Sequence, residues 1–286
     1  MSLTITPLNP VLGAEVTGID LAGPLDATAA TELRHAFEAY HVLVFPGQPI
    51  DDAAHVRFSR HFGELEIFPR QVNRSALLPA IFQISNVGPD NRLLPVDGDE
   101  WRYLSDIHVW HTDSSYREIP SKGAILHGIE IPPSGGDTLW CNLFAVYEAL
   151  PDDLRQRIRG RTARNSIAYQ RSRKELPPLA PEEAAAVPPV AQKLARTHPD
   201  GRTSLYISPC YIDTISGLDF AESQALLAEL VEFAGQERFV YRHIWQPHDV
   251  VMWDNRCTMH RVEPFDAAHQ RRVMHRTALV GDEPVA

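Results

Sequence analysis

Short strand-forming runs, each closed by a turn signal, recur along most of the chain and constrain its fold more than any other feature. The clearest runs occupy residues 41–45, 81–85, 123–130, 137–141, 204–208, 240–244, 250–253 and 272–279. Short apolar runs between Gly and Pro residues are typical of strands. With two helices expected near the start, at 26–40 and 51–62, the pattern predicts a mainly β fold with helical additions. A double-sheet jelly roll is the architecture that fits it best.

A single domain spanning residues 1–286 is expected, because a β-rich core with insertions accommodates this length. Two segments depart from the strand pattern, near residues 66–106 and 165–195. We interpret both as lid-like excursions over the core rather than as linkers between domains. The first leads directly toward His111, and loops beside reactive groups commonly select the substrate.

The charge balance limits the classes of partner. A formal net charge of -10 and a pI near 5.7 argue against a nucleic-acid partner, which calls for a basic surface. A small anionic substrate stays compatible, since a few arginines create a local positive pocket. The three widely spaced cysteines favour a reducing compartment. Without a signal-peptide pattern or a membrane-spanning apolar run, we expect a cytoplasmic protein with no membrane partner.

Residues 110–116, Trp-His-Thr-Asp-Ser-Ser-Tyr, place an imidazole and a carboxylate two positions apart. In a strand such residues share a face, so His111 and Asp113 could both reach one metal ion. His260 is the best placed third ligand. Two histidines and one carboxylate form the facial triad of non-haem Fe(II) oxygenases. Taken alone, His-x-Asp is also compatible with a surface or capping pair, so neighbouring segments must decide.

Further segments, distributed over nearly the whole chain, match the sequence pattern of a known enzyme family. They are residues 5–8, 12–18, 62–65, 135–140, 270–276 and 281–282, in addition to the metal segments. With them the chain resembles the family of 2-oxoglutarate-dependent Fe(II) dioxygenases that contains taurine dioxygenase and the 2,4-dichlorophenoxyacetate dioxygenases. The resemblance implies a cupin-like double-stranded β-helix core, with iron held by His111, Asp113 and His260.

The resemblance also implies the reaction. Fe(II), 2-oxoglutarate as co-substrate and O2 are the expected cofactors, and a small organic acid is hydroxylated while succinate and CO2 are released. Asp113 bears on the reaction type, because related halogenases lack this carboxylate and bind chloride in its place. Its presence here favours hydroxylation.

The cationic segment near the C-terminus supplies candidates for binding two acids. Arg272 is assigned to the distal carboxylate of 2-oxoglutarate, with the Thr138 hydroxyl as a second donor, because a guanidinium and a carboxylate match in a two-bond fork. Arg276 lies on the same strand face, and the resemblance implies that it binds the acidic group of the primary substrate. Arg271 and His275 face the other way, and structural roles are expected for them.

The expected primary substrate is inferred from positions at which this chain differs from the taurine enzymes. Taurine enzymes carry polar residues where this chain has Phe68, Gln71 and Ile107. These residues disfavour taurine, and residues 84–87 and 110–116 look closer to the aryloxyalkanoate enzymes. We therefore expect an aryloxyalkanoate such as 2,4-dichlorophenoxyacetate, cleaved to a phenol. The alternatives are a taurine, alkylsulfonate or alkyl sulfate dioxygenase, or a non-catalytic cupin-like protein that binds a metal and an acid. A homo-oligomer is expected.

Overall fold

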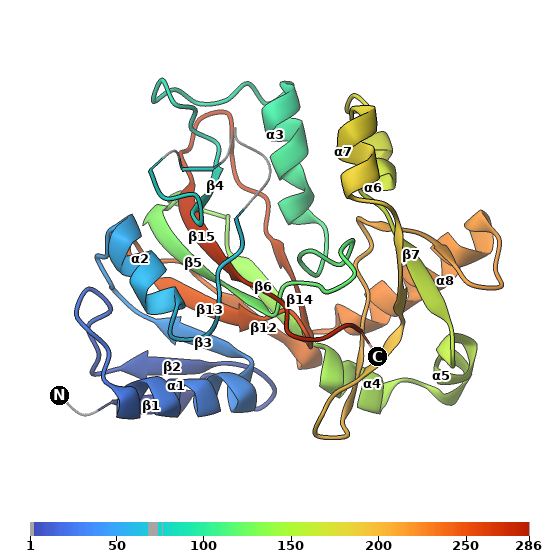
Figure 1. Cartoon of the computed structure of the whole chain (residues 1–286), viewed down its shortest axis with the longest axis horizontal. Coiled ribbons are helices and arrows are strands. Elements are labelled where there is room, and N and C mark those ends of the chain that lie inside the picture. The colour runs from blue at the N-terminus through green and yellow to red at the C-terminus, as the bar shows by residue number, and fades with distance from the viewer. Residues whose placement is uncertain (1–2, 68–73, 76, 286) are drawn as a thin grey trace.

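The computed structural model describes residues 3–67, 74, 75 and 77–285, and its largest layer is a seven-stranded sheet (Figure 1). The strand order is β1 (Thr4–Pro7), β2 (Ala14–Thr17), β3 (Val42–Phe45), β13 (Val250–Asp254), β5 (Gly123–Glu130), β15 (Val273–Leu279) and β4 (Phe82–Ser85). Neighbouring strands pair antiparallel, apart from the parallel pair β2 and β3. Segments far apart in the sequence therefore meet at the centre of this sheet.

A smaller sheet lies against the large one and completes the jelly-roll core. Its strands are β12 (Val240–His243), β6 (Thr138–Asn142) and β14 (Thr258–Val262). Buried side chains from both sheets form one apolar cluster that includes Trp140 of β6 and Trp253 of β13. The predicted mainly β fold with a jelly-roll core is thus confirmed, and the core lies between the two sheets.

The large sheet is buried on both faces at its centre. On β13, Val251 and Trp253 point to the smaller sheet, whereas Val250 and Met252 join a second apolar cluster with helices α1 (Ala27–Tyr40) and α2 (Asp52–Ser59). Both helices begin where the sequence predicts, because Asp26 and Asp51 accept hydrogen bonds from backbone N–H groups three residues on. Burial on both faces explains why β13 shows no polar alternation.

Between β6 and β12 the chain builds a second packed region beside the core. It contains α4 (Leu143–Ala149), α5 (Asp152–Ile158), α8 (Phe220–Ala234) and η2 (Glu237–Phe239). Its strands are β7 (Thr162–Asn165), β8 (Val190–Lys193), β11 (Ile212–Ile215) and the hairpin of β9 (Ala195–Thr197) and β10 (Thr203–Leu205). The predicted strand at 204–208 is mostly wrong, since β10 ends at Leu205.

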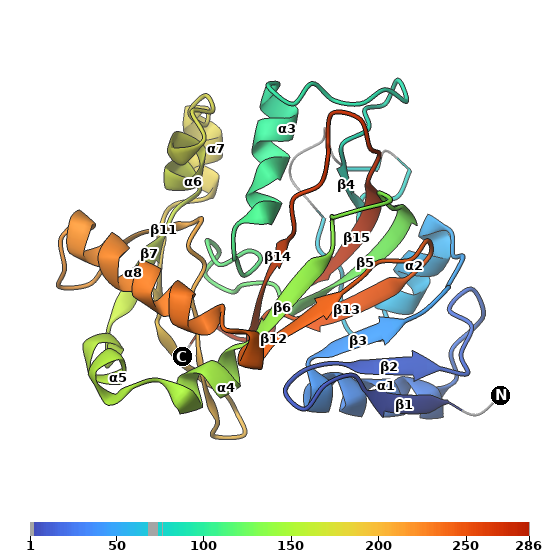
Figure 2. The same cartoon turned by 180° about the vertical axis from the view of Figure 1, so that it is seen from behind.

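The two excursions contain short helices that the sequence pattern does not reveal. The first holds α3 (Asp99–Leu104) and the 3-10 helix η1 (Ser105–His108), and the second holds α6 (Ile167–Arg173) and α7 (Pro181–Ala186). Both views of the molecule place α3 beside α6 at one end of the core (Figures 1 and 2). Among the described residues, no helix combines the length and apolarity needed to cross a membrane.

Candidate functional site

His111 and His260 are brought together by a backbone bridge. Each backbone N–H donates to the other residue's carbonyl, at 2.9 Å and 2.8 Å, and the ring centroids lie 4.2 Å apart. The Nδ1 atom of His111 lies 2.7 Å from the Val109 carbonyl, so it carries the proton and leaves the Nε2 lone pair available. The edge of β14 therefore presents two imidazole nitrogens toward one point.

The Asp113 side chain is directed toward the same point by a turn, and not by the strand that the sequence predicted. His111 forms an isolated bridge rather than part of a strand, and the chain turns directly after Asp113, with Ser114 at a φ of 57°. The expectation of a shared strand face is wrong, although the convergence is correct. The Asp113 carboxylate oxygens lie 4.0 Å from Nε2 of His111 and 3.9 Å from Nε2 of His260.

The protonation states of Asp113 and His260 suit a divalent cation. Burial alone would raise the pKa of Asp113, but Arg276 and the two histidines outweigh it and hold that pKa at about 2. Burial and the neighbouring His111 keep the pKa of His260 well below its usual value, so its ring is neutral. Oδ2 of Asp113 is buried without a hydrogen-bond partner among the described residues. One carboxylate and two imidazole rings are the donor set that suits Fe(II).

A second group of possible ligands has a structural explanation. His41, Asp254 and Cys257 also gather within 4.8 Å, but Asp254 already accepts three hydrogen bonds of 2.8–2.9 Å from Arg256. Its charge is therefore balanced inside the protein. The Thr258 hydroxyl donates to the Asp254 carbonyl, at 2.6 Å, and the resulting turn leads into β14 and His260.

Arg272 occupies a position that calls for an anion. Its side chain is 2% exposed, its Nε donates to the Gly136 carbonyl at 3.3 Å, and one terminal nitrogen has no hydrogen-bond partner in the described structure. Burial lowers the pKa of Arg272 to about 10, so it stays charged at neutral pH. A buried cation without a carboxylate is costly, and an acid bound beside it would supply the missing partner.

One narrow cavity brings Arg272 together with two of the candidate metal ligands, His111 and His260. Its wall also includes Thr138, with Leu126, Val262 and Ile107 among the apolar residues. A carboxylate group at each end of an aliphatic linker matches this distribution of charged and apolar surface. The predicted residues Thr138 and Arg272 are thus brought together with the candidate metal ligands.

His111 and Asp113 both line a second cavity. Arg276 and Ile107 line it as well as the first, and Arg276 donates to Oδ1 of Asp113 at 2.8 Å. Two of the predicted substrate residues, Phe68 and Gln71, lie outside the described residues. Arg276 therefore lines the cavity and also contacts Asp113, a candidate metal ligand. The sequence did not indicate the contact with Asp113.

An aromatic wall in this second cavity escaped the sequence analysis. Phe82, Tyr103, Tyr116 and Tyr211 line it, and the rings of Tyr116 and Tyr211 lie 5.0 Å apart. The four residues come from β4, α3, the turn after Asp113 and the loop before β11. They converge through tertiary packing and share no periodic signal. Phe82, Tyr103 and Tyr116 lie in segments that the sequence indicated as a strand, a lid-like excursion and the metal-ligand motif, but none of the four was predicted to contact the substrate.

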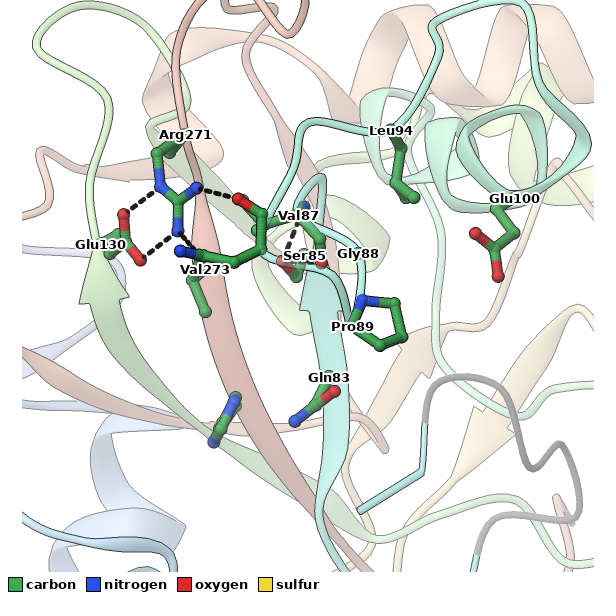
Figure 3. Close-up of a pocket in the computed structure, with 12 residues that line it drawn as sticks. Gln83, Ser85, Val87, Gly88, Pro89, Leu94, Glu100, Glu130, Arg271 and Val273 are labelled. Atoms are coloured by element: carbon green, nitrogen blue, oxygen red, sulfur yellow. Dashed lines mark hydrogen bonds and ion pairs between the residues drawn. The ribbon is translucent and has the colours of Figure 1, made fainter. Parts of the chain in front are cut away.

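A separate pocket lies on the opposite face of β4 and β15, away from the candidate metal ligands. Figure 3 shows Arg271 and Glu130 facing each other there, joined by two hydrogen bonds of 2.6 and 2.9 Å. His275, on the same face, lies 2.6 Å from Asp52. Arg271 and His275 thus have the outward orientation expected from strand alternation, and both side chains are used in structural pairs.

Comparisons with known proteins agree with this geometry. The family described as taurine catabolism dioxygenase TauD, TfdA family matches residues 4–278. An α-ketoglutarate-dependent 2,4-dichlorophenoxyacetate dioxygenase of Cupriavidus pinatubonensis is 37% identical over 98% of both chains. An (S)-phenoxypropionate/α-ketoglutarate-dioxygenase of Sphingobium herbicidovorans is 35% identical over 97% of this chain and 95% of the relative.

The structure of AAD-2 in complex with Mn(II) and N-oxalylglycine superposes with a TM-score of 0.90, at 36% identity, covering 100% of this chain and 99% of the other. Jelly-roll fold and sequence together define a non-haem oxygenase. The chain belongs to the TauD/TfdA family. It is a dioxygenase that uses Fe(II), 2-oxoglutarate and O2.

Proposed function

We propose that this dioxygenase hydroxylates an aryloxyalkanoic acid, represented by 2,4-dichlorophenoxyacetate, at the carbon beside the ether oxygen. The product collapses to a phenol and an oxo acid, while 2-oxoglutarate and O2 give succinate and CO2. The observation that carries the proposal is the second cavity, whose wall combines the Arg276 cation and four aromatic rings with His111 and Asp113. The names of the two relatives, both enzymes of phenoxy acids, support it.

In the proposed site, His111, Asp113 and His260 hold Fe(II), and Arg272 and Thr138 bind the distal carboxylate of 2-oxoglutarate. Bound there, Fe(II) and 2-oxoglutarate supply the oxidant for hydroxylation. The narrow first cavity suits this role, because its apolar wall excludes water and strengthens the pairing between Arg272 and an acid.

The substrate is oriented by two features of the second cavity. Arg276 binds the carboxylate, and the aryl ring packs against the tyrosines and Phe82. Because Arg276 also contacts Asp113, the acid group is held next to a proposed metal ligand. The carbon between the carboxylate and the ether oxygen then lies on the side of the cavity that His111 and Asp113 line.

The test is succinate and phenol release by the purified protein with Fe(II), ascorbate and 2-oxoglutarate. Phenoxyacetates and phenoxypropionates are compared with taurine, longer alkylsulfonates and alkyl sulfates. Turnover of the phenoxy acids, lost in His111→Ala, is the expected result. Turnover limited to the sulfur acids would replace the substrate and leave the reaction in place. Absence of iron-dependent succinate with every acid would favour a binding protein.

Homo-oligomeric assembly and a cytoplasmic location stay predictions from the sequence. Light scattering coupled to size-exclusion chromatography tests the first, and a monomer at micromolar concentration would contradict it. Fractionation of cells that express the protein tests the second.

A further inference from the structure

We propose that Trp245 is a positioning residue for 2-oxoglutarate, acting through the hydroxyl group of Thr138. The indole Nε1 of Trp245 donates to Oγ1 of Thr138 at 2.9 Å. Both side chains are buried, at 4% and 1% exposure. The inference rests on the proposed role of Thr138 and Arg272 in binding the distal carboxylate of the co-substrate.

The direction of this hydrogen bond decides what the hydroxyl group does. An indole N–H only donates, so Oγ1 of Thr138 must act as the acceptor. The hydroxyl proton is then directed elsewhere, and Oγ1 makes no other hydrogen bond to any residue in the described parts of the chain. Since Thr138 lines the cavity that contains Arg272, its proton is available to a carboxylate bound there. Trp245 thus fixes the hydroxyl as a donor.

Trp245 is itself held in place from several sides. The ring of His243 meets it edge-on, with centroids 4.7 Å apart, and Nε2 of His243 lies 3.0 Å from Oδ2 of Asp249. Gly128 leaves room for the indole, because a Cβ there would lie 3.2 Å from Cε3 of Trp245 and 2.8 Å from Ile131. A ring fixed in this way donates to Thr138 without a large loss of side-chain entropy on binding.

The pairing also keeps two donors directed at the same anion. Arg272 approaches from the segment before β15, and its backbone N–H is held by Oδ1 of Asn86 at 2.8 Å. Thr138 approaches from β6, and its hydroxyl is held by Trp245. A carboxylate has enough lone pairs for a guanidinium and a hydroxyl together. Loss of the indole N–H would let the hydroxyl rotate and accept from Arg272 instead of donating to the acid.

A double-mutant cycle tests this arrangement. Trp245→Phe removes the N–H and keeps an aromatic ring, and Thr138→Val removes the hydroxyl and keeps the shape. The Kd of N-oxalylglycine in the presence of Mn(II) is measured by calorimetry for all four proteins. We expect Trp245→Phe to weaken binding about threefold to tenfold, and the double variant to bind no more weakly than Thr138→Val. The KM for the aryl acid should stay within about twofold of the parent value.

Each other outcome has a defined meaning. Equal weakening by Trp245→Phe in the presence and absence of the Thr138 hydroxyl would overturn the proposal, because the indole would then act by packing alone. Unchanged binding in Trp245→Phe would overturn it as well. If Thr138→Val and Arg272→Gln both left the Kd unchanged, the proposed co-substrate site itself would be wrong.

A second measurement covers the case in which Trp245→Phe does not fold. Thr138→Ser keeps the hydroxyl, and Thr138→Val removes it, while both retain the tryptophan. In 15N-tryptophan-labelled protein, the Trp245 indole resonance should keep its position in Thr138→Ser and move in Thr138→Val, in parallel with the Kd of N-oxalylglycine. A shift in both variants, or in neither, would contradict the proposed contact.

Discussion

Arg276 donates to Oδ1 of Asp113 at 2.8 Å, so the proposed substrate residue touches a proposed metal ligand. Asp113 is buried and Arg276 is mostly buried, with 13% of its side chain exposed, and the ion pair contributes to holding the pKa of Asp113 at about 2. Burial disfavours an isolated charge on either residue. Within the ion pair, each charge is stabilised by the opposite charge of its partner. If Arg276 binds the substrate as proposed, one guanidinium couples substrate binding to the charge of the proposed metal site.

We expect Arg276→Gln to raise the KM for the aryl acid by roughly tenfold to a hundredfold, since a charge-assisted bond to the carboxylate is lost. The KM for 2-oxoglutarate should change much less. Steady-state kinetics with each acid varied in turn measures the two effects. Arg271→Gln is the matched control, because it removes the same charge from the opposite face of β15. Equal effects of the two variants would contradict the assignment.

Lys174 joins the two excursions above the second cavity. Its Nζ donates to the carbonyls of Arg102 and Tyr103 at the end of α3 and lies 3.3 Å from a carboxylate oxygen of Asp106. Gln170 of α6 donates to the same carboxylate. A cation at the C-terminal end of a short helix stabilises the helix. The Lys174 ammonium group also anchors α3 to the second excursion.

We expect Lys174→Met to release α3 while the side-chain stem keeps its packing. Trypsin should then cleave after Arg102 severalfold faster, as followed by mass spectrometry, because proteolysis requires local opening. The KM for the aryl acid should rise, and that for 2-oxoglutarate should not. Lys193→Met, at an exposed position of β8, serves as the control. Unchanged cleavage after Arg102 would show that α3 is held by other contacts.

Local rules explain which parts of the molecule the sequence predicts. Asp26 and Asp51 begin helices because a capping carboxylate acts within three residues. The break between α4 and α5 at Pro151 follows from proline geometry in the same way. The possible ligand atoms of His111, Asp113 and His260 lie within 4.8 Å of one another, and the family resemblance, rather than the His-x-Asp spacing alone, implied this grouping.

The elements and cavity residues that the sequence did not predict depend on contacts between distant segments. Helices α3, α6 and α7 have six or seven residues each, too few for a clear apolar period. The α3 helix is held by Lys174, which lies 70 or more residues further along the chain. Tyr211 joins Tyr116 by the same kind of long-range packing. Such positions have no signal in a single sequence.

Gly135 marks a close approach of two loops next to the small sheet. It has a φ of 72°, and a Cβ there would lie 2.4 Å from the Pro264 carbonyl oxygen. We expect Gly135→Ala to lower the free energy of unfolding by roughly 2 kcal/mol or more, measured by urea denaturation. Gly160→Ala is the control, because its φ is 70° and an added Cβ there would meet no atom within 4 Å among the described residues, so it shows the backbone cost alone. Equal losses would rule out a clash at Gly135.

His55 and His127 couple the stability of the large sheet to pH. Both are buried on its outer face, with ring centroids 6.3 Å apart. Burial, reinforced by the neighbouring histidines, lowers the pKa of His55 to about 3 and that of His127 to about 4, against 6.5 for an exposed ring. In the folded state both rings are therefore neutral over the range in which the unfolded chain takes up protons.

The stability contributed by these neutral rings is fully present above pH 6.5 and is lost as the pH falls below that value, because the unfolded state then binds more protons. Each histidine should contribute a slope of roughly 1.4 kcal/mol per pH unit below 6.5. Urea denaturation at pH 7.5, 6.0 and 5.0 measures the slope. We expect His127→Gln to reduce it and His35→Gln, on the exposed face of α1, to leave it unchanged. Equal slopes in all three proteins would show that other groups control the acid sensitivity.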